Sequence, residues 1–287
     1  MLSATPADAA PTTALHRLLD ANLALPPEYA EELTNHLPMA LHALAALGAD
    51  DDRLHRFFEG YARRFAGRLA EPSGAPVARD WLPLRGRSDA LGALRATLSA
   101  RVRLDGRDAL LRAVLPALWP GVAAAAFHGA IRTAHAVESG HDGELADALA
   151  YWAWRWQPLP DGDAGPILAS SNWCDALREQ ARSWRPEGRL ISHRMAQAAT
   201  ATPYRELAMR VPITPELPAQ LWAFAAARYA ATRNFTVLHL VTGLRAVHVL
   251  WPWVDDPQTA LREAVKAFTA AFLAAGVSTT DLAPLPA

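Results

Sequence analysis

Helical spacing of apolar residues is the feature that most limits how this chain can fold. From residue 12 onward, apolar side chains recur every three or four positions, and strand-like patterns are scarce. We therefore expect an all-α fold: a single-domain bundle of roughly a dozen helices over residues 1–287, with 1–11 a flexible N-terminal tail. The helices are expected near 12–23, 28–48, 51–70, 88–100, 107–119, 122–139, 143–157, 173–184, 190–198, 203–210, 216–233, 236–250 and 257–275.

Charge and cysteine content exclude several classes of protein. The 287 residues include 28 basic and 29 acidic side chains, so no global positive field exists to bind nucleic acid or an anionic membrane, and neither partner is expected. The single cysteine, Cys174, excludes an intrachain disulfide and a cysteine-rich metal site. Because no signal peptide and no membrane span is recognisable, we expect a cytoplasmic location.

Histidine and tryptophan supply most of the chemistry that this composition allows. The chain has 10 of each, which are metal ligands and large flat surfaces respectively. Lys266 is the only lysine, and a lysine kept among arginines hints at a place that needs an amine, although a GC-rich genome gives the same bias. No HExxH, GxSxG or glycine-rich phosphate loop is present.

A first histidine pair lies on the helix expected at 122–139. A helical wheel places His128, Ile131, Arg132 and His135 on one face. His135 follows His128 by seven positions, about 10.5 Å along the axis, so at most one of the two is expected to bind a given ion. Both could instead be ordinary hydrogen-bonded polar residues.

Two further histidines lie beside unusual neighbours. His239 shares a helix face with Gly243 and other small residues, which either leave a hollow for a ligand or admit another helix closely, and His248 is expected in the core. His36 precedes Pro38 inside an expected helix, where proline predicts a kink that would aim the imidazole at a site. The alternative is a polar turn between two shorter helices.

In this order and combination, the segments resemble the questin oxidase-like family. The resemblance extends over roughly residues 28–275 and rests on Asn35–Ala40, Ala45–Ala49, Phe57–Tyr61, Pro120-Gly121, Phe127–Arg132 and Leu238–Gly243. It implies an oxygenase, because fungal members insert oxygen into anthraquinone or related polyketide rings and open them. The substrate implied is therefore a small aromatic molecule of the quinone type.

The resemblance also implies a non-haem iron centre. Its histidines are matched by His36, His128 and His239, and Lys266 matches a lysine that supplies an oxygen ligand as its carbamate. The cofactors implied are iron and O₂, with NADPH a candidate reductant. Iron(II) that activates O₂ favours neutral imidazoles, an anionic oxygen ligand and an open position, so this donor set is chemically reasonable.

Two positions depart from the fungal pattern. Arg132 stands where fungal relatives tend to have a second histidine, and Glu263 stands where a histidine often precedes the lysine. Glu263 could supply the anionic oxygen in place of Lys266. On its own helix Lys266 lies beside Arg262 and away from the apolar stripe, which is typical of a solvated lysine rather than a carbamate.

Catalytic and substrate-binding roles are assigned with alternatives. Arg132 and His135 are the catalytic candidates; Arg132 could orient a phenolate or bound superoxide, or it could form a salt bridge to Glu138 or another acid. Trp152 and Trp156 share a helix face and could stack an aromatic substrate, or they could belong to the core.

Two other functions stay open beside the iron oxygenase. One is a metal-free helical oxidase or hydrolase that uses His128 or His239 as a general base. The other is a non-catalytic helical protein that binds an apolar metabolite. The alanine-rich helices and the tryptophans also leave room for a homodimer.

Overall fold

Each helix expected from periodicity has a counterpart in the computed structural model, which describes residues 13–30, 32–70, 74–75 and 80–276. The all-α prediction is confirmed, and the expected tail, residues 1–11, lies outside the described residues. A two-stranded antiparallel hairpin is an addition, as are short 3₁₀ turns between helices, for example Leu82–Leu84. The elements are α1 (Thr13–Asn22), β1 (Glu28–Tyr29), β2 (Leu33–Thr34), α2 (Leu37–Ala46), α3 (Asp51–Ala62), α4 (Leu91–Asp105), α5 (Arg107–Leu118), α6 (His128–Ser139), α7 (Asp142–Trp154), α8 (Ser170–Ser183), α9 (Ile191–Ala199), α10 (Thr202–Leu207), α11 (Leu217–Thr232), α12 (Phe235–Leu250) and α13 (Pro257–Ala274).

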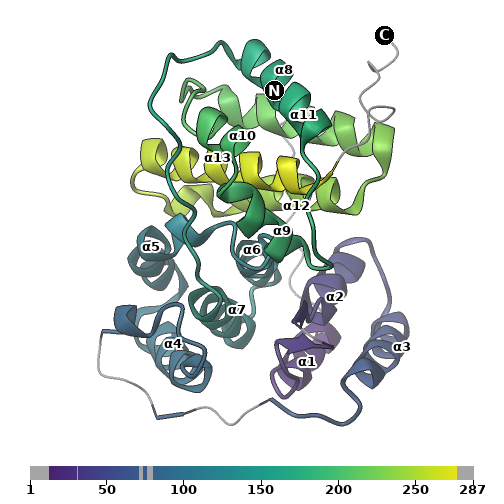
Figure 1. Cartoon of the computed structure of the whole chain (residues 1–287). Helices are drawn as coiled ribbons and strands as arrows, with labels where there is room; N and C mark the ends of the chain where they lie inside the picture. Colours follow the sequence, from purple (N-terminus) through teal and green to yellow (C-terminus); the bar gives the residue numbers. More distant parts are fainter. Residues whose placement is uncertain (1–12, 31, 71–73, 76–79, 277–287) are drawn as a thin grey trace.

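The helices are arranged around α6, α12 and α13. Figure 1 shows α12 and α13 crossing the middle of the molecule, with α8, α10 and α11 on one side and α4 to α7 on the other. Helices α1, α2 and α3 pack on one another as a separate group, and α2 also packs against α6. Because α12 packs on α6 as well, α6 brings together helices that are distant in sequence.

The helix expected at 28–48 is shorter at its start. The β1–β2 hairpin occupies residues 28–34, and α2 begins at Leu37 with Pro38 in its first turn. Asn35 fixes this start, because its side-chain oxygen accepts the Leu37 amide and its amide group donates to Asn22. The expected kink was wrong, because proline is tolerated in a first turn, where its missing N–H has no helical partner. The alternative of a turn between two shorter helices holds only in part, since a hairpin and not a helix precedes α2.

The helix expected at 122–139 also begins late, at His128. Ala125, Ala126 and Phe127 all have positive φ angles, of 48°, 55° and 67°, so three residues with side chains adopt the left-handed conformation. Each costs roughly 1–2 kcal/mol. A strained turn therefore lies immediately before His128. Strained backbone is often found at functional sites.

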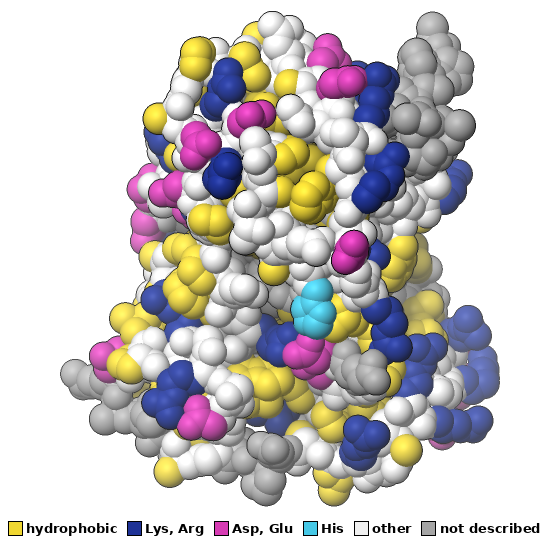
Figure 2. Space-filling model, viewed as in Figure 1, with side chains coloured by type: hydrophobic (Ala, Val, Ile, Leu, Met, Phe, Trp, Pro, Cys, Tyr) yellow, Lys and Arg dark blue, Asp and Glu magenta, His cyan; other side chains and the backbone are white. Residues whose placement is uncertain are grey.

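No helix in the described ranges is long and apolar enough to cross a lipid bilayer. In the view of Figure 2, hydrophobic side chains lie in small groups among charged ones, and basic side chains gather along the right-hand edge, over α3 and its neighbours.

Candidate metal centre

Three helices place their histidines side by side. His36 directly precedes α2, His128 is the first residue of α6, and His239 lies in the second turn of α12. The Nε2 atoms of His36 and His128 are 2.8 Å apart, and the ring centroids of His128 and His239 are 5.0 Å apart. The structure thus brings together the three histidines that the family resemblance singled out.

Hydrogen bonds fix which nitrogen of each ring carries the proton. The Nδ1 of His36 contacts the carbonyl oxygen of Thr34 at 2.7 Å, and that of His239 contacts the carbonyl of Phe235 at 2.8 Å. His128 makes the same contact with the carbonyl of Ala125. A carbonyl only accepts, so each Nδ1 donates and each neutral ring keeps a lone pair on Nε2. Metal-binding histidines are commonly oriented in this way.

The contact between His36 and His128 demands a positive charge. With both protons on Nδ1, two Nε2 lone pairs face each other at 2.8 Å, which is repulsive unless a proton or a cation lies between them. Two metal–nitrogen bonds of about 2.1 Å at a right angle would place their nitrogens about 3 Å apart. The donor set of this pair therefore fits a transition-metal ion, whereas His239 packs against the ring of His128 without completing a set of three ligand atoms within 4.8 Å of one another.

Burial keeps the three rings neutral. Loss of solvation lowers the pKa of His36, His128 and His239, and the effect is greatest for His128. The rings also lower one another's pKa, because charging one disfavours charging the next. Neutral imidazoles are the form that binds metals, so no proton has to be removed near pH 7.

The surroundings of His239 settle one of the alternatives left by the sequence. A Cβ atom added at Gly243 would lie 2.7 Å from the Phe127 ring, so the small residue admits a neighbouring side chain and not a ligand. The ring of Phe235 packs edge-on against His239 and is 65% exposed, which makes this the side on which the cluster approaches solvent. His248 is exposed, and its expected place in the core was wrong.

Arg132 points away from the histidines. Its guanidinium is buried and donates to both oxygens of Glu144, at 2.6 and 2.8 Å, and to Asp147 at 2.6 Å. Both acids lie on α7, so the ion-pair alternative holds, with acids other than the expected Glu138. The substrate-orienting role expected for Arg132 is not favoured, because its charge is already bound by two carboxylates.

Lys266 is not solvated, as its helical wheel had suggested. It is 4% exposed because α13 is buried on nearly all faces, and its ammonium group contacts Asp161 at 2.9 Å and Glu263 at 2.8 Å. Burial opposes the charge, but the two carboxylates raise the pKa of Lys266 above its ordinary value. A carbamate forms only on a neutral amine, so this ion pair disfavours it. Lys266 and Glu263 bind each other and do not join the histidine cluster.

Replacing Lys266 by methionine is expected not to change the amount of Fe(II) that the folded protein retains after loading. The variant should lose about 1 kcal/mol of unfolding free energy, because the half-buried Glu263 carboxylate loses its partner. Elemental analysis after iron loading and denaturant unfolding measure the two effects. Arg262→Ala, an exposed neighbour on α13, is the control. Loss of iron without loss of fold would show that Lys266 is a ligand after all.

The two tryptophans expected to bind substrate have different places. Trp152 is fully buried, and its indole N–H donates to the Gly121 carbonyl at 3.0 Å, so it belongs to the core. Trp156 lines a pocket of about 370 Å³ together with Trp154, His193 and Ala125. The helical wheel failed here because α7 ends at Trp154, so Trp156 no longer follows helical geometry.

This pocket adjoins the histidine cluster. Ala125 lines it, and the carbonyl of the same residue accepts the Nδ1 proton of His128. Sequence reasoning missed Trp154, which the wheel pointed away from Trp152, and it missed His193. The run of alternating tryptophans from residue 152 to 156 was the available signal, provided that the end of the helix was known.

His135 lies apart from His128, further along the same helix. Its Nδ1 is 2.8 Å from the Nδ1 of His42 on α2. Burial lowers the pKa of His135 to about 3, so the ring is neutral and is a weak base near neutral pH. A role as the general base is therefore disfavoured.

The fold and the site define an all-helical protein with buried, neutral imidazoles gathered from three helices beside a tryptophan-lined pocket. A family model described as Questin oxidase-like matches residues 33–286, and the chain belongs to that family. The match covers most of the chain and includes all three histidines, so the resemblance seen in the sequence is confirmed. No curated protein sequence matches the chain.

Proposed function

We propose that this protein is an oxygenase that acts on a small aromatic substrate of the quinone or phenol type, with iron bound by His36, His128 and His239. The observation that carries the proposal is the shared orientation of the three rings: each Nδ1 is tied to a carbonyl, and the unprotonated Nε2 atoms of His36 and His128 meet at 2.8 Å. Membership in a family named for an oxidase supports it.

The residues around the cluster would prepare the site. The carbonyls of Thr34, Ala125 and Phe235 hold the rings in place, so little reorganisation accompanies metal binding. The burial of His128 and His239 excludes water from the centre. When bound, iron(II) would supply the ability to engage O₂.

The aromatic substrate is assigned to the pocket beside Ala125. Its volume of about 370 Å³ is within the range of small-molecule sites, and Trp154 provides an aromatic wall, whereas a face of Trp156 is already stacked by Arg85, 3.9 Å from the ring centroid. Arg155 and His193 also line the pocket, where both contact Glu32 and Arg155 also contacts Glu28, so they give it a polar wall. The strained turn at Ala125 separates this pocket from His128, so a substrate here would lie next to the metal centre.

The electron balance distinguishes two reactions. Insertion of one oxygen atom next to a carbonyl consumes two electrons and two protons from a reductant such as NADPH, and the second atom leaves as water. Insertion of both atoms needs no external reductant. Incubation with ¹⁸O₂ and mass spectrometry of the product, with and without NADPH, separates the two.

The test is the iron content and the oxygen uptake of histidine variants. After anaerobic loading with Fe(II), we expect His36→Ala, His128→Ala and His239→Ala each to weaken iron binding at least tenfold and to reduce uptake of O₂ with hydroxyanthraquinones to background, because each removes one ligand. His248→Ala, an exposed histidine on the same helix as His239, is the matched control and should behave as the unaltered protein.

Other outcomes would favour the other functions. Full turnover with less than a few tenths of a metal ion per chain would indicate a metal-free enzyme with a histidine base. Aromatic ligand binding that none of the three variants changes, without any turnover, would indicate a binding protein.

A further inference from the structure

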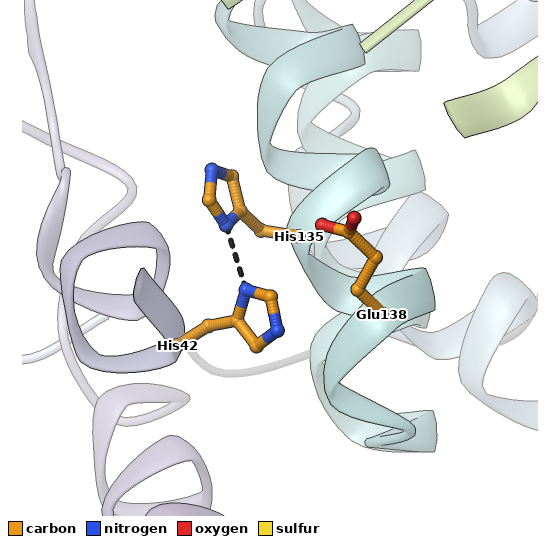
Figure 3. Close-up of side chains that lie close together, drawn as sticks. All are labelled: His42, His135 and Glu138. Carbon is orange, nitrogen blue, oxygen red and sulfur yellow. Dashed lines mark hydrogen bonds between the residues drawn. The ribbon is translucent and has the colours of Figure 1, made fainter. Parts of the chain in front are cut away.

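We propose that His42, His135 and Glu138 form a second metal site, distinct from the histidine cluster and suited to a divalent transition metal such as Zn(II), Co(II) or Fe(II). His42 lies on α2 and the other two residues lie on α6. Figure 3 shows the two imidazoles pointing at each other across the gap between these helices, with the carboxylate of Glu138 beside them. The site therefore links two helices and does not lie on a single one.

The three side chains are close enough to bind one ion. One ligand atom from each of the three residues lies within 4.8 Å of the other two, and the Nδ1 atoms of the histidines are 2.8 Å apart. Two imidazoles and one carboxylate are the ligand set of many non-haem iron sites, and the same ligands suit zinc and cobalt. Three ligands leave positions for water.

The helix geometry separates this site from the first. His42, on α2, follows His36 by six positions, and His135 follows His128 by seven on α6. The second pair therefore lies about 10 Å further along the same helix–helix contact. No histidine is shared. The first cluster is mostly buried, whereas His42 and His135 are half-buried and Glu138 is exposed, so the second site is reached from solvent.

Arg245 orients the carboxylate and also limits the affinity. Its Nη2 contacts the two oxygens of Glu138 at 2.6 and 2.7 Å, and this fixes the carboxylate while leaving each oxygen a free lone pair. The guanidinium offsets the negative charge of Glu138, so the attraction for a cation is smaller than for an unpaired carboxylate. We expect weaker metal binding here than a site with an unpaired acid would give.

A metal at this site would crosslink α2 to α6. These are the helices that carry His36 and His128, so occupancy of the second site would hold the first pair in register. This consequence for iron rests on the proposed function, whereas the existence of the second site does not.

The experiment is a metal titration of the full chain with Co(II), repeated with Zn(II). Isothermal calorimetry and elemental analysis give the stoichiometry, and the visible absorption of Co(II) reports its ligands. We expect two ions per chain for the unaltered protein. His42→Ala and His135→Ala should each remove one ion and leave the other, and Glu138→Gln should weaken that one ion at least tenfold. His55→Ala, an exposed histidine on α3, is the control.

The first site provides an internal comparison. In His128→Ala the ion that depends on His135 should remain, and in the His128→Ala/His135→Ala double variant both should be lost. If the first cluster proves not to bind iron, the second site is tested independently: His135→Ala should still lose an ion that His128→Ala keeps. The proposal is overturned if His42→Ala, His135→Ala and the conservative Glu138→Gln all bind Co(II) and Zn(II) as the unaltered protein does.

Discussion

Replacing Arg132 by methionine is expected to lower the free energy of unfolding by about 3–5 kcal/mol, the usual cost of removing one partner from a buried ion pair. Arg132 is 1% exposed, and it is bound to Glu144 and Asp147, which are also buried. Methionine fills a similar volume but cannot donate. Both carboxylates would then lose charge-assisted hydrogen bonds in a place that water does not reach.

The two acids would not suffer equally. Asp147 keeps a second cation, Arg95, whose guanidinium also donates to it, whereas both hydrogen bonds of the buried Glu144 carboxylate come from Arg132 and Arg95 acts on it only through its charge. Burial already raises the pKa of Glu144, and without Arg132 it would take up a proton. We therefore expect Arg132→Met/Glu144→Gln to recover part of the loss, because the second change removes the charge that the first leaves unpaired.

Denaturant unfolding of both variants measures these effects. Arg103→Met on the exposed face of α4 is the matched control and should change stability by less than about 0.5 kcal/mol. A single variant that unfolds at the same denaturant concentration as the unaltered protein would show that the network contributes nothing. The result bears on the site because Arg132 ties α6, which carries His128, to α7.

Local sequence patterns predicted the helices because their boundaries are set by local chemistry. Asp50 accepts the Arg53 amide at the start of α3, and Pro257 occupies the first position of α13, as expected from their types. The turn at Ala125–Phe127 was missed for the opposite reason. Alanine favours a right-handed helix, so the sequence around Ala125 predicts no left-handed turn. The turn is accompanied by a tertiary contact, the packing of Phe127 against Gly243 on α12.

The histidine cluster depends on tertiary contacts, so periodicity alone could not assemble it. A helical wheel placed His128 and Arg132 on one face, yet the 40° between them is enough to direct one toward α2 and the other toward α7. The order of the family's motifs supplied the grouping of His36, His128 and His239. The pair of His42 and His135 was not anticipated, because neither residue has a distinctive neighbour in the sequence.

Replacing Gly129 by alanine is expected to cost about 3 kcal/mol of stability, the upper end of what overpacking costs. A Cβ atom here would lie 2.7 Å from the Cβ and Cγ atoms of Trp152 and 2.9 Å from its Cα. Trp152 cannot swing aside, because it packs against Trp119 and its indole is bonded to Gly121. The backbones of α6 and α7 would have to separate.

The same change should reach the histidine cluster, because Gly129 directly follows His128 at the start of α6. A shift of this turn would pull His128 from His36, so Co(II) binding at the first cluster should weaken while binding that depends on His135 persists. Gly60→Ala on α3 is the control: its added Cβ meets nothing within 4 Å, and alanine should stabilise that helix by about 0.5–1 kcal/mol. Equal stability for the two alanine variants would contradict the close approach of α6 to α7. An unchanged Co(II) affinity in Gly129→Ala would show that metal binding at the first cluster does not depend on how these helices pack.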